Sequence, residues 1–458
     1  MKKHNHWSAD AIIYHIYPLG LCGAPAQNDF NSPPIERLRQ LYGWTSHIQE
    51  LGCNTIYMGP LFESSAHGYD TADYFTVDRR LGTNQTFRAL STHWHQMGFR
   101  LLLDGVFNHV GRDFQPFKDL QIHGKASAFK DWFSGIDFTK RSPFDDPFSY
   151  DSWKGNYDLV KLNLAHPEVR AYLFSAIETW MDEYAIDGLR IDVAEQIDLD
   201  FLKALSLFCR QKRADFWLMG EVVEGKDYRK WANPDLLDSV TNYQGYGAIL
   251  DGHTQKTYVE TAQCLNQQFG LRGQYTGLIL YNFVDNHDVN RVAGMLQNPA
   301  HLILLYVFLF TLPGVPSVYY GSEWGLDDTR QGNGDQPLRP FIPAIPNEAE
   351  QARPDLLKAI RRLARLRREY AALRYGSYEQ TLVDHHQIAY VRRWQQETML
   401  VVINAHPTEV SLPVPLLQRD ATLVRELWNE NVFIEVHAEH LQVKVPAYTT
   451  CIFKLDNP

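Results

Sequence analysis

The chain is poor in cysteine. Its 458 residues include five, which are widely spaced and form no Cys-x-x-Cys pair. An odd, scattered set of this kind argues against a disulfide framework and against a cysteine metal site. We therefore expect the protein to be reduced. The five positions are Cys22, Cys53, Cys209, Cys264 and Cys451.

A basic excess is also missing. The formal net charge is −10, and no basic stripe occurs in the first three quarters of the chain. Because the phosphates of nucleic acids require clustered Lys and Arg, we expect no nucleic-acid partner. One basic run does occur at 361–368, where apolar residues recur near helical spacing. This run predicts an amphipathic helix with a solvated charged face.

Long apolar runs are absent as well. The longest, Leu302–Leu312, is well short of the ~18 residues that a membrane span requires. No apolar signal core follows Met1-Lys2-Lys3. The sequence has no Gly-x-Gly-x-x-Gly motif between a strand and a helix and no Gly-x-x-x-x-Gly-Lys-Ser/Thr motif, which disfavours a nucleotide-dependent enzyme. We expect a cytoplasmic protein with no membrane partner.

Aromatic residues, in contrast, are abundant. They make up 13% of the chain, with 11 Trp, 24 Tyr and 24 Phe. A large core would account for them, and so would a cleft whose aromatic faces stack on the apolar faces of sugar rings. Composition alone leaves both interpretations open.

Short β-rich runs alternate with helical patterns along most of the chain. The helical segment Arg37–Leu51 ends at Gly52, Thr86–Met97 ends at Gly98, and Pro167 begins a periodic segment that reaches Tyr184. Eight strands separated by helices predict an α/β fold with a closed parallel (β/α)8 barrel, the TIM barrel. The expected strands are Ile12–Tyr17, Thr55–Met58, Arg100–Val106, Gly188–Asp192, Phe216–Met219, Leu237–Thr241, Leu278–Val284 and Ser317–Tyr320.

Two segments depart from this alternation. Residues 110–166 are too long for a simple connection and show no sustained period, so we expect a small domain inserted after the third strand. Residues 377–458 show alternating strands and predict a C-terminal antiparallel β-sandwich domain. The barrel would then comprise residues 1–109 and 167–376. The strands expected in the C-terminal domain are Gln387–Arg393, Met399–Asn404, Val410–Val414 and Thr449–Phe453.

Polar residues cluster at the carboxyl ends of four expected strands, which face substrate in a barrel of this kind. A turn-forming role would explain one such cluster, but four on separate strands favour an active site. Arg190 and Asp192 are two residues apart on one strand, so their side chains share a face. An adjacent Arg favours the ionised form of Asp192, as a nucleophile requires. The four segments are Asp104–His109, Gly188–Asp192, Gly220–Glu221 and Phe283–Asp288.

These four segments, in this order, resemble the signature segments of the α-amylase family of glycoside hydrolases. The resemblance extends along nearly the whole chain. His67-Gly-Tyr69 is similar to a family segment whose Tyr stacks on the sugar at the cleavage point, and residues 314–323 resemble the eighth strand. The expected activity is retaining hydrolysis of α-glucosidic bonds in α-glucan oligosaccharides.

The resemblance implies a role for each residue. Asp192 would attack the anomeric carbon, and Glu221 would act as general acid and then as general base, with the two carboxyl groups ~5–5.5 Å apart. Asp288 would bind sugar hydroxyls and favour the distorted ring. Arg190 would orient Asp192. The remaining expected roles are sugar contacts for Tyr69, His109 and His287, and support of the site by Asp104.

The sequence does not predict a required cofactor. Asn108 matches a position that binds calcium in calcium-dependent members of the family, but no partner carboxylates align in the inserted segment. Asn108 as a plain turn residue is at least as good an interpretation.

The substrate subclass is less defined. The stretch Leu159–Asn163 is similar to that of neopullulanases and cyclomaltodextrinases, which favours small linear or cyclic maltodextrins. Glu195-Gln196 stands where starch-cutting members have a Lys-His pair, and Val222-Val223-Glu224 follows Glu221 in place of aromatic and His residues. A 4-α-glucanotransferase and an inactive binding homologue remain alternatives. The oligomeric state is left open, and so is any role for the polar stretch Asp327–Arg339.

Overall fold

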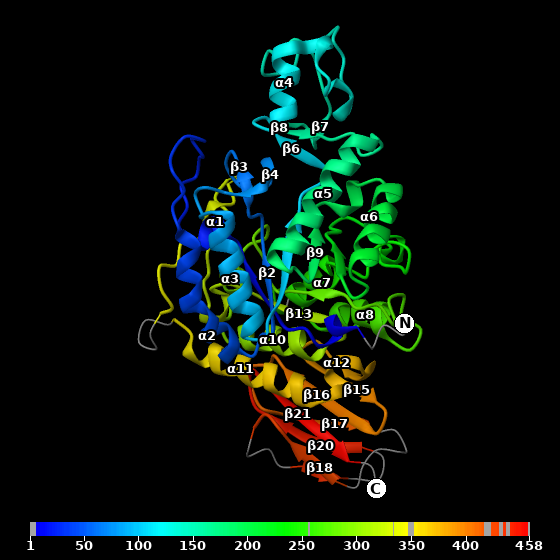
Figure 1. Ribbon diagram of the computed structural model, residues 1–458. Helices are drawn as coiled ribbons and strands as arrows, with labels where there is room; N and C mark the ends of the chain where they lie inside the picture. The colour runs from blue at the N-terminus through cyan, green and yellow to red at the C-terminus, as the bar shows by residue number, and fades with distance from the viewer. Residues whose placement is uncertain are drawn as a thin grey trace.

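The computed structural model describes residues 6–254, 257–332, 334–346, 352–415, 423–429, 434–436 and 440–456. Met1-Lys2-Lys3 lies outside the described residues. Eight short parallel strands form the centre of the molecule (Figure 1). In sheet order they are β11 (Ser239–Val240), β10 (Trp217–Gly220), β9 (Gly188–Ile191), β5 (Arg100–Gly105), β2 (Thr55–Met58), β1 (Ile13–Ile16), β13 (Val315–Tyr319) and β12 (Tyr281–Asn282).

The sheet closes on itself. An isolated parallel bridge joins Thr241, directly after β11, to Tyr281 at the start of β12. Each of the eight expected strands is present, and the predicted (β/α)8 barrel is confirmed. The seventh is shorter than predicted, because β12 pairs with β13 only as far as Pro316. Proline has no N–H to donate, so the ladder ends there.

Helices surround the barrel (Figure 1). The segment predicted as Arg37–Leu51 consists of a 3-10 turn, Arg37–Gln40, followed by α2 (Leu41–Leu51), and Gly52 ends it with a φ of 93°. Thr83 caps α3 (Asn84–Gln96) through its side chain. The other helices are α1 (Pro18–Leu21), α3 (Asn84–Gln96), α5 (Pro167–Tyr184), α6 (Leu199–Lys212), α7 (Tyr243–Thr254), α8 (Val259–Phe269), α9 (Val292–Met295), α10 (His301–Thr311), α11 (Pro354–Glu369) and α12 (Ala371–Tyr375).

The segment after β5 projects from one end of the barrel (Figure 1). It contains α4 (Gln115–His123) and an antiparallel sheet in the order β6 (His109–Gly111), β8 (Asn156–Lys161) and β7 (Ser152–Trp153). The sequence showed no sustained period here because these elements are short. Strand β6 begins at His109, one residue before the predicted start of the inserted domain. A separate hairpin, β3 (Phe62–Ser64) and β4 (Thr71–Val77), precedes α3.

The C-terminal strands form two antiparallel sheets at the opposite end of the barrel (Figure 1). Their apolar faces share a core that includes Val391 and Val402 from the larger sheet and Leu441 and Val443 from the smaller one. The larger sheet has the order β14 (Ser377–Val383), β15 (Gln387–Trp394), β16 (Glu397–Asn404), β21 (Thr449–Asp456), β18 (Leu423–Glu426), and the smaller one β17 (Val410–Pro415), β20 (His440–Val445), β19 (Ile434–Val436). The antiparallel C-terminal domain is thus confirmed, with four strands more than the sequence indicated.

The basic run 361–368 forms part of α11, as predicted, but its charged residues do not all face solvent. Arg367 is 1% exposed. Its Nη1 donates to the carbonyl oxygens of Phe310 (2.7 Å) and Leu373 (2.9 Å). The first of these belongs to the last turn of α10, whose carbonyls lack partners within the helix. The prediction of a fully solvated face was therefore wrong for Arg367, which satisfies the end of a neighbouring helix.

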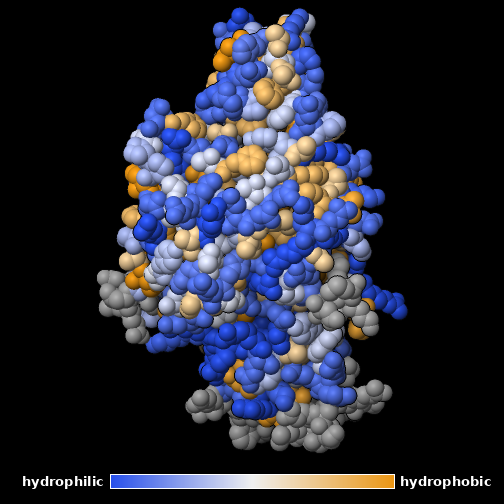
Figure 2. Space-filling model, in the orientation of Figure 1, coloured by the Kyte–Doolittle hydropathy of each residue, from blue (hydrophilic) through white to orange (hydrophobic). Residues whose placement is uncertain are grey.

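The apolar run Leu302–Leu312 covers most of α10 and its C-cap, Leu312, and is buried almost throughout. Within the described residues, no helix combines the length and the apolar character needed to cross a membrane. Figure 2 shows a largely hydrophilic face with scattered apolar residues. All five cysteines are free, and four of them are buried.

Candidate active site

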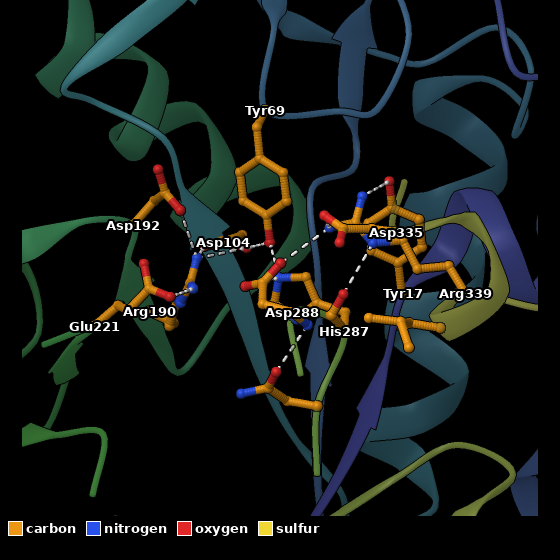
Figure 3. A network of polar contacts seen from close by, with 12 residues as sticks. Tyr17, Tyr69, Asp104, Arg190, Asp192, Glu221, His287, Asp288, Asp335 and Arg339 are labelled. Carbon is orange, nitrogen blue, oxygen red and sulfur yellow. Dashed lines mark hydrogen bonds and ion pairs between the residues drawn. The ribbon is translucent and has the colours of Figure 1, made fainter. Parts of the chain in front are cut away.

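One arginine connects three carboxylates at the carboxyl ends of adjacent barrel strands (Figure 3). Arg190, on β9, places Nη1 2.8 Å from Asp104 Oδ1 and 2.9 Å from Asp192 Oδ1. Its Nη2 lies 2.7 Å from Glu221 Oε1. All four residues are at most 5% exposed. The predicted strand-end cluster thus forms one buried ionic network.

The charges in this network do not balance. Burial raises the pKa of Asp192 well above its ordinary value, and Arg190 lowers it less than burial and the neighbouring carboxylates raise it. Burial likewise raises the pKa of Glu221, with Arg190 opposing and Asp288 adding to the shift. Arg190 favours the ionised form of Asp192, as expected, but burial and the neighbouring carboxylates oppose it. One guanidinium charge is shared among three carboxylates, so the Asp192–Glu221 pair retains a proton to higher pH than two isolated carboxyl groups would.

The strand-to-helix turn after Asp192 holds Glu221 in place. Val193 adopts a φ of 41°, a left-handed conformation that is unfavourable for a β-branched residue. In this conformation its N–H donates to Glu221 Oε2 at 2.9 Å. The backbone strain therefore coincides with a contact that links the ends of β9 and β10.

We expect Asp192→Asn to stabilise the folded protein at pH 7, on the order of 1 kcal/mol, because it removes a charge that burial disfavours. A raised pKa means that the carboxyl's contribution to stability is fully present below about pH 4 and is lost as the pH rises through the folded-state pKa. The gain should thus disappear toward pH 4. Urea unfolding at both pH values would measure it.

Asp146→Asn is a control with the opposite sign. Burial opposes the shift, but hydrogen bonds from Arg112, Ser142 and Gln121 hold the pKa of Asp146 below its usual value. This variant should lose stability at pH 7, and the loss should fade as the pH drops below the ordinary Asp pKa. If Asp192→Asn were also less stable at pH 7, the attraction of Arg190 would outweigh burial and repulsion.

Tyr69 connects this network to the residues after β12. Its hydroxyl donates to Asp104 Oδ2 at 3.0 Å and bonds to Nε2 of His287. The Tyr69 and His287 rings are stacked with centroids 5.6 Å apart. Tyr57, on β2, donates to the same Asp104 oxygen at 3.0 Å. Asp104 is therefore fully occupied by protein contacts, as its predicted supporting position implies.

Asp288 is held from the opposite side of the site (Figure 3). His287 Nε2 lies 2.9 Å from its Oδ2, and Arg339 Nη2 lies 2.9 Å from its Oδ1. Burial opposes the shift, but His287 and then Arg339 hold the pKa of Asp288 well below its usual range. The pKa of Asp288 is thus shifted down, whereas the pKa values of Asp192 and Glu221 are shifted up. The Asp288 side chain is 32% exposed and is therefore more accessible than those of Asp192 and Glu221.

Sequence reasoning left Arg339 without a role. In the structure its guanidinium also packs over the ring of Tyr17, 4.6 Å from the centroid. Asp335 accepts from Arg339 at 3.3 Å, and Arg330 donates to Asp335 at 2.7 Å. The stretch Asp327–Arg339 therefore reaches the site through Arg339; residue 333 within it is not described. Its polarity in the sequence had left its role open.

His109 faces the nucleophile candidate from β6. Its Nε2 lies 3.9 Å from Asp192 Oδ2 and has no hydrogen-bond partner. Burial, with a smaller effect of His67, lowers the pKa of His109 to about 3, so the ring is neutral. The ring of Trp153 lies 6.0 Å away.

Asn108 does not resemble a metal ligand in its surroundings. Its Nδ2 lies 3.1 Å from His109 Nδ1, while its buried Oδ1 has no partner. Calcium takes six to eight oxygen ligands, commonly several carboxylates. Among the described residues no group of three or more His, Cys, Asp or Glu side chains could hold a metal ion. A single amide oxygen does not make a calcium site.

The fold and the site define a class of protein. Paired buried carboxylates at the carboxyl ends of parallel barrel strands are the arrangement of (β/α)8-barrel glycoside hydrolases. The family model for the α-amylase catalytic domain matches residues 40–344, and that for the C-terminal domain of maltogenic amylase matches residues 378–452. The chain therefore belongs to the α-amylase family and is a glycoside hydrolase.

Several individual members of the family are similar to this chain over most of its length. A cyclomaltodextrinase from Bacillus sp. is 33% identical over 87% of this chain and 73% of its own length. An intracellular maltogenic amylase from Bacillus subtilis is 31% identical over 79% of this chain and 59% of its own. The ligand-free structure of cyclic α-maltosyl-(1→6)-maltose hydrolase from Arthrobacter globiformis superimposes with a TM-score of 0.82 at 28% identity, covering 98% of this chain and 99% of that one.

Proposed function

We propose that this glycoside hydrolase cleaves α-glucosidic bonds, mainly α-1,4, in maltooligosaccharides and cyclic maltodextrins, with retention of configuration. The observation that supports this most directly is the pairing of Asp192 and Glu221 through the two terminal nitrogens of Arg190. That pairing holds two carboxyl groups together at adjacent strand ends, as a retaining mechanism requires.

In the first step, Asp192 attacks the anomeric carbon and forms a glycosyl ester. Glu221 transfers its proton to the glycosidic oxygen as the carbon–oxygen bond breaks. Burial raises the pKa of both carboxyl groups, so the pair retains a proton for this transfer to higher pH than two isolated carboxyl groups would. The ester bond discharges the Asp192 carboxylate, so Glu221 can ionise without adding to the total negative charge.

In the second step, ionised Glu221 removes a proton from water, whose oxygen attacks the same carbon and releases Asp192. Asp288 remains ionised throughout and would hydrogen-bond sugar hydroxyls of the ring that is being distorted. His287 and Arg339 keep that carboxylate charged and oriented. Tyr69 would stack on the same sugar.

His109 would add a further sugar contact. Its Nε2 is unpartnered beside Asp192 and is available to a hydroxyl of the sugar under attack. Because the ring is neutral, it adds no charge near the anomeric carbon, where positive charge develops in the transition state.

The relatives support the choice of substrate and location. Two are named for cyclic α-glucans and one for a maltogenic activity inside the cell. We therefore propose short linear or cyclic α-glucans as substrates and the cytoplasm as the location. We propose that the reaction requires no cofactor; among the described residues no group of three or more His, Cys, Asp or Glu side chains could hold a metal ion.

We expect the purified protein to degrade maltotetraose and a cyclodextrin faster than soluble starch. Proton NMR of the first product should show the α-anomer, because two displacements at one carbon restore its configuration. Initial release of the β-anomer would contradict the double displacement. Much faster cleavage of amylose than of small oligosaccharides would contradict the substrate class.

The alternative acceptor is another sugar. A 4-α-glucanotransferase would carry out the same first step and use a sugar hydroxyl in the second. Adding maltose to the maltotetraose reaction distinguishes the two, since a transferase would convert most of the substrate into longer products.

A further inference from the structure

The turn between β7 and β8 carries an unusual residue. Lys154 and Gly155 connect Trp153 to Asn156 and have φ values of 47° and 80°. Hairpin turns of this kind favour Asn, Asp or Gly, because a left-handed conformation costs other residues about 1–2 kcal/mol. The left-handed backbone conformation disfavours lysine at position 154, so its presence there suggests a role for the side chain.

That side chain reaches across to the barrel. Lys154 Nζ lies 2.9 Å from Glu224 Oε1, three residues after Glu221. The Glu195 carboxylate, just past Asp192, accepts the N–H of Glu224 at 3.1 Å. Lys154 is therefore the cation that meets a group of acidic residues following both proposed catalytic carboxyls. The hydrogen bond that Lys154 donates to Glu224, followed by the charges of Glu224, Glu195 and Glu221, raises the pKa of Lys154, and burial opposes the shift.

The ion pair is accessible. The Lys154 and Glu224 side chains are 51% and 71% exposed, so their mutual attraction contributes little to folding stability. Both retain donor and acceptor capacity for a ligand. Val223, between Glu224 and the buried Val222, is 43% exposed. The loop after Glu221 thus presents polar and apolar surface together.

The preceding residue ties the same turn to the other side of the site. The Trp153 ring lies 6.0 Å from that of His109, which in turn faces Asp192. The buried Nε1 of Trp153 has no hydrogen-bond partner. The turn therefore extends from the nucleophile candidate to the loop that follows the proposed acid.

We propose that Trp153 and Lys154 bind the sugar that leaves in the first step and the sugar that accepts in transfer, with Glu224 holding the Lys154 ammonium in position. This rests on the proposed function above. Trp153 supplies a face for the apolar side of the glucose ring, and Lys154 donates to its hydroxyls. The pair determines how tightly a leaving or accepting sugar is held, while the sugar attacked by Asp192 is bound elsewhere.

A substrate without a leaving sugar separates the two binding sites. α-Maltosyl fluoride releases fluoride, so contacts to a leaving sugar cannot contribute to its hydrolysis. We expect Lys154→Asn to lower kcat/KM for maltotetraose about tenfold, which is the effect of one hydrogen bond to a charged donor. Its kcat/KM for α-maltosyl fluoride should change less than twofold. With glucose added to the fluoride reaction, the ratio of transfer to hydrolysis should fall about tenfold.

Two further variants exclude indirect effects. Asn suits the left-handed turn, so Lys154→Asn should fold at least as well as the wild type. Lys154→Arg keeps the cation and should retain most of the activity on maltotetraose. Lys140→Asn breaks a comparable exposed ion pair, with Asp137 at 3.1 Å in the same inserted segment. This variant should leave kcat/KM unchanged for both substrates.

The outcomes distinguish this inference from the function on which it rests. A wild type inactive on both substrates overturns the proposed function. An active wild type with Lys154→Asn unchanged on both substrates, or equally impaired on both, overturns the role of Lys154 alone.

Discussion

Glu221→Gln should reduce hydrolysis of maltotetraose by roughly 10²–10⁴-fold, because an amide of the same shape cannot transfer a proton to the leaving oxygen. Glu221 is 5% exposed and is fixed by Arg190 and by the N–H of Val193. Both contacts are made to carboxylate oxygens, and the amide Nε2 of Gln can replace neither acceptor. The kcat for maltotetraose, followed by product separation, measures the effect.

Fluoride and azide distinguish loss of proton transfer from general damage to the site. Fluoride leaves without protonation, and azide attacks without a general base. Glu221→Gln supplied with α-maltosyl fluoride and azide should therefore form α-maltosyl azide at a substantial rate. Glu50→Gln, at a 65% exposed position on α2, should keep full activity. Retention of a tenth or more of wild-type hydrolysis by Glu221→Gln would rule out its proposed role.

The second large effect concerns Arg190. Replacing it with Met should destabilise the protein by roughly 3–5 kcal/mol at pH 7 and abolish activity, since three buried carboxylates lose their common partner. The loss of stability should diminish as the pH falls toward 4, because the carboxyls can then take up protons. Urea unfolding at pH 7 and pH 4.5 would measure both effects.

Arg213→Met provides the matched control. Arg213 donates to buried Asp187 at 2.6 Å, but Asp187 also accepts from Arg100 at 2.7 Å and lies 3.0 Å from His95 Nε2. Removing one of several partners should cost less than about 1.5 kcal/mol. If Arg190→Met were no more destabilising than this control, the carboxylates would have found other partners or protons at little cost.

Much of the fold followed from local patterns. The alternation of β-rich runs and helical segments predicted the barrel, and β2 has the predicted bounds, Thr55–Met58. Helix α5 likewise spans Pro167–Tyr184 as predicted. The elements of the inserted segment and half of the C-terminal strands were missed. Strands β18 and β19, of four and three residues, carry too few side chains to show a period.

The composition of the active-site cluster was also predictable in part. Arg190 and Asp192 lie on one face because side chains alternate along a strand, and this holds whatever surrounds them. The ends of β5, β9, β10 and β12 converge because the barrel brings all strand ends to one face. The roles assigned to these residues remain predictions.

Other features depended on contacts between distant parts of the chain. Arg339 reaches Asp288 across 51 residues, and Lys154 reaches Glu224 across 70. Arg367 is buried because α11 packs against the end of α10. No local pattern encodes these pairs, since each requires the position of a loop or helix relative to another element.

The sequence by itself determined the strand–helix alternation, the faces on which the polar strand-end residues lie and the family to which the chain belongs. Only the tertiary structure decided which charge each residue meets. Arg190 faces three carboxylates and not one, so burial and mutual repulsion raise the pKa of Asp192 and Glu221 while His287 and Arg339 lower that of Asp288. Periodicity is a property of neighbouring residues, whereas a pKa depends on every charge and on the solvent that folding brings near or excludes.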